Sequence, residues 1–184
     1  DLSVRASLEA RSLVSIEGCL VVRSEYYAPS LTSIGSYLSV QYKLTLPELK
    51  SIGGYLSVES TFHAPALDCI EGYLGVENDF QVPSLLVVHG DLYVEKSFRA
   101  DELYSVGGYI HVGAPLTSPS LKSIGDYLLV QSDILAPSLN QIGNDLFLEA
   151  DCDLTTLHGS THNTTILRVK EGFEIELMQE TEYS

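Results

Sequence analysis

Side chains of the kinds that bind zinc gather near the end of the sequence. Cys152, His158 and His162 follow the spacing Cys-x5-His-x3-His, with an aspartate on each side of the cysteine. Thiolate, imidazole and carboxylate groups are the usual ligands of zinc, so this run could supply three of them. The spacing fits no strong zinc signature, however, and the run follows the last clear repeat of the chain. From the sequence we therefore assign no metal ion and no cofactor.

Groups suited to acid–base catalysis occur in the middle of the chain. Asp68 and Glu71 form the one pair of acids that could work with His89. Carboxylate and imidazole groups exchange protons with a substrate when they face the same groove. Both acids lie where the sequence predicts a turn, which explains them without catalysis. Because the chain also has no nucleophile-elbow motif and no phosphate-binding glycine loop, we predict a protein that is not an enzyme.

Charge and composition exclude further classes of function. Ten Lys and Arg residues oppose 25 Asp and Glu residues, which gives a formal charge of -15 and argues against direct binding of nucleic acid. No apolar run reaches the roughly 20 residues of a membrane-spanning helix, so we expect no membrane contact. A protein partner fits better, and a basic one would complement the charge.

The three cysteines bear on the location of the protein. They stand at 19, 69 and 152, an odd number at irregular spacing. This pattern does not resemble a disulfide framework and indicates a reducing compartment or an unpaired thiol. The location is unknown on this basis, with the cytoplasm favoured and a cell surface or virion left open.

An internal repeat provides the elements that must position any site. One 18-residue phrase recurs from Arg5 to Leu148 without an insertion, which makes eight units. The unit at 41–58, QYKLTLPELKSIGGYLSV, shows its features. A unit this short cannot bury its own apolar residues, so successive copies must stack on one another.

The apolar columns of the repeat predict the fold. Positions 4, 6, 9, 12, 16 and 18 of the unit are apolar in almost every copy. Positions 16 and 18 alternate with polar or aromatic neighbours, which predicts one dominant strand near the end of each unit. Glycine at position 13 or 14 and proline at position 7 mark two corners. We expect an all-β protein, a β-solenoid or parallel β-helix of about eight 18-residue coils over residues 1–148.

Residues 149–184 differ from the repeats, and we expect them to form an acidic C-terminal cap. They include eight acidic and two basic residues, and the stretches 165–169 and 173–177 alternate like two more strands. Atypical charged ends protect the open core and the strand edges of solenoids. An unprotected end would also allow a homodimer through the solenoid ends. At the other end, residues 1–4 match the close of a unit, so we expect further chain before them.

The repeat phrase A-P-x-L-x-S-I-G-G-Y-L-x-V resembles the leucine-rich-repeat-like coils of bacterial and bacteriophage proteins. More distantly, it is similar to receptor L domains and to fungal cell-surface proteins with S-I-G-G-x-L repeats. The resemblance covers about 148 of the 184 residues and implies a solenoid. It implies no single function, because such solenoids serve adhesion, receptor binding and inhibition alike. The shorter unit and the absence of the disulfides of L domains argue against an extracellular receptor.

Aromatic residues around the predicted strand indicate a binding face. Position 15 is Tyr in five of the eight units, and position 17 adds aromatic residues toward the C-terminal half. Tyrosine is enriched where proteins bind one another, although a tyrosine ladder that only stabilises the sheet is the alternative. The predicted partner-binding residues of this face are Tyr37, Tyr55, Tyr73, Tyr93, Tyr109, Tyr127, His111 and Phe147.

Glutamates at position 1 of three consecutive units predict an acidic flank beside that face. Stacking would align Glu59, Glu77 and Glu95 in one row, where like charges repel. The row is either a solvated edge or the contact for a cationic partner.

Three functions remain open on this sequence. We favour a non-enzymatic module that binds a protein through the tyrosine-rich strand face and the acidic flank. The second is an acidic inhibitor that mimics nucleic acid against a host defence or DNA-processing enzyme. The third is an adhesive or structural segment of a larger surface or phage tail protein.

Overall fold

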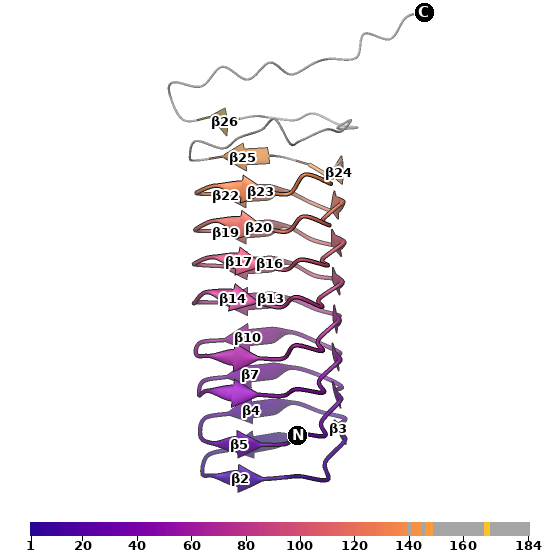
Figure 1. Cartoon of the computed structure of the whole chain (residues 1–184), viewed down its shortest axis with the longest axis vertical. Helices are drawn as coiled ribbons and strands as arrows, with labels where there is room; N and C mark the ends of the chain where they lie inside the picture. The colour runs from indigo at the N-terminus through magenta and orange to yellow at the C-terminus, as the bar shows by residue number, and fades with distance from the viewer. Residues whose placement is uncertain (140, 145, 149–167, 170–184) are drawn as a thin grey trace, which may run out of the picture.

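The protein, in a computed structural model, is a stack of β-coils around one continuous core (Figure 1). The structure describes residues 1–139, 141–144 and 146–148, together with the backbone of 168–169. Strands of successive repeats pair in parallel, each residue with its counterpart in the next unit, as Leu56 pairs with Leu74. The predicted β-solenoid is therefore confirmed, and the described residues contain no helix. It follows that none of them forms a helix long and apolar enough to cross a membrane.

The strand predicted at the end of each unit forms the first sheet. In the strands between residues 20 and 130, the two outer residues are buried and the central residue is partly exposed except at Gly75, as the alternation predicted. The strands are β1 (Leu2–Val4), β4 (Leu20–Val22), β7 (Leu38–Val40), β10 (Leu56–Val58), β13 (Leu74–Val76), β16 (Leu92–Val94), β19 (Ile110–Val112), β22 (Leu128–Val130), β25 (Leu146–Leu148) and β26 (Arg168–Val169). Strand β26 belongs to the segment predicted as a cap, and it pairs in parallel with β25. The rest of that segment lies outside the described residues.

Each coil also contains two strands that the sequence did not predict, so the core is enclosed by three sides. Positions 11 and 12 form the second sheet: β3 (Ser15–Ile16), β6 (Ser33–Ile34), β9 (Ser51–Ile52), β12 (Cys69–Ile70), β15 (Val87–Val88), β18 (Ser105–Val106), β21 (Ser123–Ile124) and β24 (Gln141–Ile142). The predicted strand at the end of the unit is the longest of the three, with three residues, and the two additional strands have two residues each. Two-residue strands are too short to show the alternation that identifies a strand in a sequence.

Positions 4 and 5 form the third side, which is divided into three separate sheets. The first contains β2 (Leu8–Glu9) and β5 (Tyr26–Tyr27), and the second contains β8 (Leu44–Thr45) and β11 (Phe62–His63). The third contains β14 (Phe80–Gln81), β17 (Phe98–Arg99), β20 (Leu116–Thr117) and β23 (Ile134–Leu135). The backbone ladder of this side is thus interrupted between β5 and β8 and again between β11 and β14.

The predicted apolar columns fill the core. In the unit at 41–58 the six column residues are each at most 1% exposed: Leu44, Leu46, Leu49, Ile52, Leu56 and Val58. Burying a side chain of this size contributes about 1.5 to 3 kcal/mol before the cost of ordering the chain. The apolar columns are therefore the main source of cohesion between the coils.

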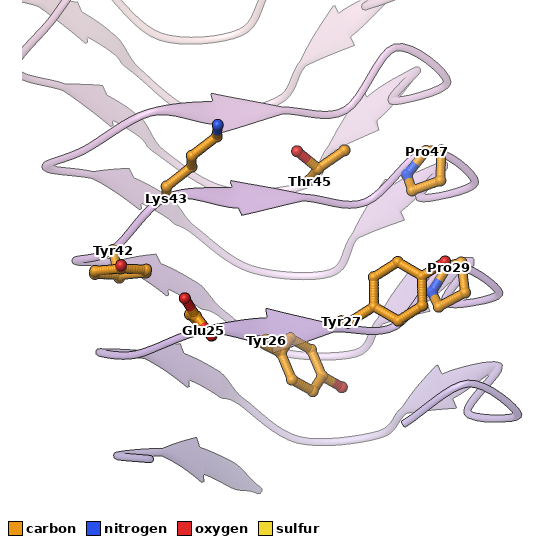
Figure 2. A pocket seen from close by; sticks show the side chains of 8 residues that line it. All are labelled: Glu25, Tyr26, Tyr27, Pro29, Tyr42, Lys43, Thr45 and Pro47. Atoms are coloured by element: carbon orange, nitrogen blue, oxygen red, sulfur yellow. The ribbon is translucent and has the colours of Figure 1, made fainter. Parts of the chain in front are cut away.

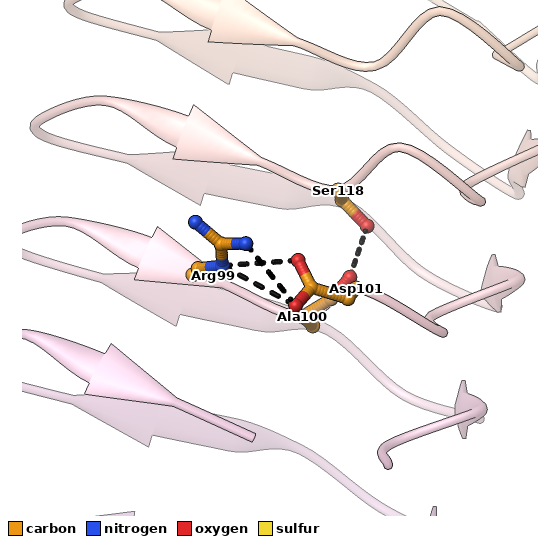
Figure 3. A network of polar contacts seen from close by, with 4 residues as sticks. All are labelled: Arg99, Ala100, Asp101 and Ser118. Carbon is orange, nitrogen blue, oxygen red and sulfur yellow. Dashed lines mark hydrogen bonds and ion pairs between the residues drawn. The ribbon is translucent and has the colours of Figure 1, made fainter. Parts of the chain in front are cut away.

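One buried polar side chain occupies position 6, a column of mostly small apolar residues. The fully buried Ser118 donates its hydroxyl hydrogen to the carbonyl oxygen of Ala100 in the preceding coil, at 3.0 Å (Figure 3). On either side of Ala100, Arg99 Nε and Asp101 form an ion pair at 3.0 Å. The hydroxyl is buried without loss because it has a backbone acceptor within reach.

The turn before the first sheet requires a glycine at position 13 or 14. A Cβ atom added at Gly35 would lie 2.9 Å from the carbonyl carbon of Glu17 in the preceding coil. At Gly72 the corresponding distance, to the carbonyl carbon of Gly54, would be 2.8 Å. The backbones approach too closely for a side chain at one of the two positions, and the other position accepts residues such as Ser36 or Glu71.

Candidate functional site

Four of the eight predicted aromatic residues form two stacked pairs, and we call the whole set of eight the tyrosine face. The ring centroids of Tyr37 and Tyr55 are 4.5 Å apart with an angle of 3° between the rings. Those of Tyr109 and Tyr127 are 4.8 Å apart with an angle of 4°. These distances match the spacing of neighbouring strands, because position 15 is repeated from coil to coil. Each ring thereby restricts the motion of its neighbour.

Tyr73 and Asp91 occupy position 15 between the two stacked pairs, and Tyr93 at position 17 adds an aromatic ring in this region. Tyr93 packs edge-on against His111, with ring centroids 4.9 Å apart. The Asp91 carboxylate accepts the backbone N–H of Tyr109 at 3.1 Å. Burial and then the charge of Asp91 raise the pKa of Tyr109, so its hydroxyl remains a hydrogen-bond donor at neutral pH.

Two residues of the tyrosine face are more exposed than the others. Tyr55 is 42% exposed and Tyr73 is 37% exposed, whereas the other six residues are half-buried. The ring of Tyr73 lies over Gly75, where an added Cβ atom would lie 2.7 Å from Tyr73 Cζ. Tyr27, Tyr42 and Tyr104 are exposed elsewhere on the molecule. Contacts between rings of successive coils, rather than exposure alone, distinguish the tyrosine face.

The acidic flank, Glu59, Glu77 and Glu95, lies along the edge of the tyrosine face. All three residues are exposed, and among the described residues none of them forms an ion pair with a Lys or Arg. Gln41 Nε2 donates to the Glu59 carboxylate at 3.2 Å, and the Tyr93 hydroxyl donates to the Glu95 carboxylate at 3.5 Å. Glu95 therefore joins the flank to the tyrosine face at Tyr93, and the charge of the flank is not neutralised by a cation in the part described.

A shallow hollow of about 360 Å³ lies on the third side, at the break between β5 and β8 (Figure 2). Rings and prolines provide most of its lining, which consists of Glu25, Tyr26, Tyr27, Pro29, Tyr42, Lys43, Thr45 and Pro47. Tyr26 is only 7% exposed, its hydroxyl has no hydrogen-bond partner, and burial raises its pKa. Figure 2 shows this hydroxyl directed away from Lys43 and Thr45, so it provides no polar group to the hollow. No motif in the sequence pointed to this feature.

Three potential metal ligands, Cys69, Glu71 and His89, meet beside the second sheet, and we call them the ligand cluster. Cys69 Sγ donates to Glu71 Oε1 at 3.3 Å, and His89 Nε2 lies 3.6 Å from Glu71 Oε2. One ligand atom of each residue lies within 4.8 Å of those of the other two. Burial, followed by the hydrogen bond to Glu71 and the charges of Glu71 and Asp68, raises the pKa of the Cys69 thiol to about 11.

Sequence reasoning identified two members of the ligand cluster and missed the third. It paired Asp68 and Glu71 with His89, and the structure brings Glu71 to His89. Cys69 could have been found by comparing units, because position 11 is Ser in five of the eight and Cys only here. The other zinc-ligand run, Cys152, His158 and His162, lies outside the described residues and stays untested.

Comparisons with protein-family models, with curated proteins and with solved structures find no significant match for this chain. Its function must therefore be inferred from its own surfaces.

Proposed function

We propose that the protein is a non-enzymatic binding module that recognises another protein through the tyrosine face and the acidic flank. The main support is the contact that joins the two surfaces, since the Tyr93 hydroxyl donates to the Glu95 carboxylate at 3.5 Å. Tyrosine combines a large apolar contact area with a polar end, which suits a protein interface. Because the stacked rings are already ordered, binding would cost little side-chain entropy.

The chemistry of the surface also defines a partner. The flank has three carboxylates without a paired cation among the described residues, and the whole chain has a formal charge of -15. A basic protein would be steered toward this charge. Lys or Arg side chains of the partner could also lie over the exposed rings of Tyr55 and Tyr73. The proposed partner is therefore a protein with an apolar patch bordered by basic residues.

Substitution of the central tyrosines tests this proposal. The variant combines Tyr55→Ser, Tyr73→Ser and Tyr109→Ser, and the matched control combines Tyr27→Ser with Tyr104→Ser, which are exposed tyrosines on other sides. Both variants and the unmodified protein are used to capture proteins from a lysate of the native host, and the bound proteins are quantified by mass spectrometry. We expect at least one partner to be reduced about tenfold or more by the first variant and retained by the control.

Full retention of every partner by a folded triple-tyrosine variant would contradict the proposal and leave a structural ladder as the role of the rings. Folding is checked by circular dichroism. Retention of glycans rather than proteins on the same face would favour the adhesive segment of a surface or tail protein.

The acidic inhibitor is the second candidate, and the unpaired charges of the acidic flank favour it. The row offers about one carboxylate per 4.8 Å of stack, whereas duplex DNA carries about one charge per 1.7 Å. Because the charge density of the flank is lower than that of DNA, we rank the inhibitor second to a module that binds through the tyrosine face. Glu59→Lys, Glu77→Lys and Glu95→Lys together would abolish binding to a basic nucleic-acid enzyme if the inhibitor is correct, and that binding would weaken steeply with salt.

The resemblance of the repeat phrase to leucine-rich-repeat-like coils of bacterial or bacteriophage proteins belongs to this proposal. It rests on the columns of Leu, Ile, Gly and Tyr in the units and on the stacked parallel coils. Such coils present a rigid side to a partner, which is the use proposed here.

A further inference from the structure

We propose that the ligand cluster, Cys69, Glu71 and His89, is a zinc-binding site. It includes no residue of the tyrosine face or the acidic flank, so it does not depend on the function proposed above. Thiolate, carboxylate and imidazole are all common zinc ligands, and the three come together from two consecutive coils.

The repeat itself supports the assignment, because each of the three residues departs from the usual residue of its column. Position 11 is Ser in five units, and position 13 is Gly in five units. Cys69 replaces the serine, and Glu71 and His89 replace the glycine in consecutive coils. The turn needs none of these three side chains, since Gly53-Gly54 and Gly107-Gly108 form it without them. Folding therefore does not explain why three ligands coincide.

The two distances to Glu71 within the cluster are close to those between ligands of a tetrahedral zinc ion. Zinc–sulfur bonds of about 2.3 Å and bonds of about 2.0 Å to nitrogen or oxygen place neighbouring ligand atoms roughly 3.3 to 3.6 Å apart. Cys69 Sγ lies 3.3 Å from Glu71 Oε1, and His89 Nε2 lies 3.6 Å from the other carboxylate oxygen, Glu71 Oε2. The ligand atoms of Cys69 and His89 lie within 4.8 Å of each other. Because Glu71 and His89 are exposed, small rotations of their side chains can bring all three groups onto one ion.

The backbone holds the ligands in place before the metal arrives. Strand β12, which contains Cys69, pairs in parallel with β15, and Cys69 is opposite Val87. The amide N–H of His89 donates to the carbonyl oxygen of Ile70 at 2.9 Å, which joins the two coils at the cluster. Asp68 adds a negative charge beside Cys69, which favours a dication.

The ligand types select zinc over the common hard cations. Magnesium and calcium prefer sites composed of oxygen ligands, whereas sulfur and imidazole nitrogen suit zinc. Three protein ligands leave the fourth tetrahedral position for water or for a donor atom of a bound molecule. The site is therefore of the open kind.

Metal titration of the full chain tests the site. Zinc binding is measured by competition with a chromophoric chelator, and Co²⁺ is used as a spectroscopic substitute. The variants are Cys69→Ser, Glu71→Gly and His89→Gly, each of which restores the usual residue of its column and preserves the turn. We expect the cluster to bind one zinc ion, and each variant to lose more than about tenfold in zinc affinity. With Co²⁺ we expect a thiolate-to-cobalt absorption band that Cys69→Ser removes.

Matched controls distinguish this cluster from the other cysteines and histidines. They are Cys19→Ser and the combined variant Cys152→Ser, His158→Asn and His162→Asn, and we expect both to bind zinc as the unmodified protein does. Unchanged affinity in the Cys69, Glu71 and His89 variants would overturn the proposal. So would loss of zinc binding in the second control alone, or an affinity weaker than about 1 mM in the unmodified protein.

Discussion

The carboxylate of Asp79 shows how a side chain joins neighbouring coils at the surface. It accepts the hydroxyl hydrogen of Ser97 at 2.5 Å and the backbone N–H of the same residue at 3.1 Å. These hydrogen bonds lower the pKa of Asp79. Since the pKa is lower in the folded state than in the unfolded state, the interaction stabilises the fold above the unfolded pKa. The stabilisation is lost as the pH falls through the folded pKa.

Ser97→Ala tests this link between coils. Loss of the hydroxyl donor should raise the pKa of Asp79 toward its ordinary value, as measured by an NMR titration of the carboxyl carbon. Ser97→Thr, which keeps the hydroxyl, is the control and should leave the pKa low. An unchanged pKa in Ser97→Ala would show that the backbone N–H alone is responsible.

Residue positions could be predicted from the repeat, but the orientation of side chains could not. The column at position 15 placed Tyr37, Tyr55 and Tyr109 on one face, and the ring contacts agree with that placement. The ring of Tyr73 lies over the backbone of Gly75, and the repeat contains no information on such an orientation. Cys69 was missed for a related reason, because its importance depends on a histidine in the next coil.

Among the elements, the turn at positions 13 and 14 gives the clearest test. Gly35→Ala would place a Cβ atom 2.9 Å from the carbonyl carbon of Glu17, in backbone that cannot move without shifting a whole coil. We expect a loss of about 1 to 3 kcal/mol in the free energy of unfolding, measured by urea denaturation.

The adjacent residue provides the control for this turn. Ser36→Ala, at the variable position of the same turn, should change the free energy of unfolding by less than about 0.5 kcal/mol. Equal effects of the two substitutions would mean that the coils do not need the close approach seen at Gly35.

The strands themselves were predictable only where three residues alternate. Leu56, Ser57 and Val58 alternate between core and surface, and the sequence placed that strand correctly. Ser51–Ile52 and Leu44–Thr45 are strands of two residues, whose pairing comes from stacking on the neighbouring coils rather than from a local pattern. Their apolar residues were nevertheless assigned to the core, because a column of identical positions reveals burial without revealing the strand.

At the scale of the whole molecule, the coils form a one-dimensional stack. The backbone pairing of each repeat joins it to the preceding and following repeats, always between equivalent positions of the unit (Figure 1). The period of the sequence therefore predicts which residues pair with one another, even where it does not predict a strand. The extent of the C-terminal cap had no such period to define it, and its boundary at residue 149 stays a prediction.

Removal of one complete unit tests this architecture. Deletion of residues 41–58 joins Val40 to Glu59 in the same phase as the natural junction of Val58 and Glu59. We expect a folded solenoid with a free energy of unfolding lower by about 1 to 3 kcal/mol, since stability is roughly 0.05 to 0.15 kcal/mol per residue. The circular dichroism spectrum per residue should be unchanged, and the zinc affinity of the ligand cluster should be retained.

Deletion of half a unit, residues 41–49, should be more damaging although it removes half as many residues. The remaining half coil, residues 50–58, lacks the strand of the third side and cannot close around the core. Ile52, Leu56 and Val58, each at most 1% exposed in the intact protein, would have to leave the core or distort the coils beside them. Chemical denaturation of both deletion variants compares their free energies of unfolding. If the shorter deletion is the more stable of the two, the coils do not act as closed units of one full repeat, and the register has another origin.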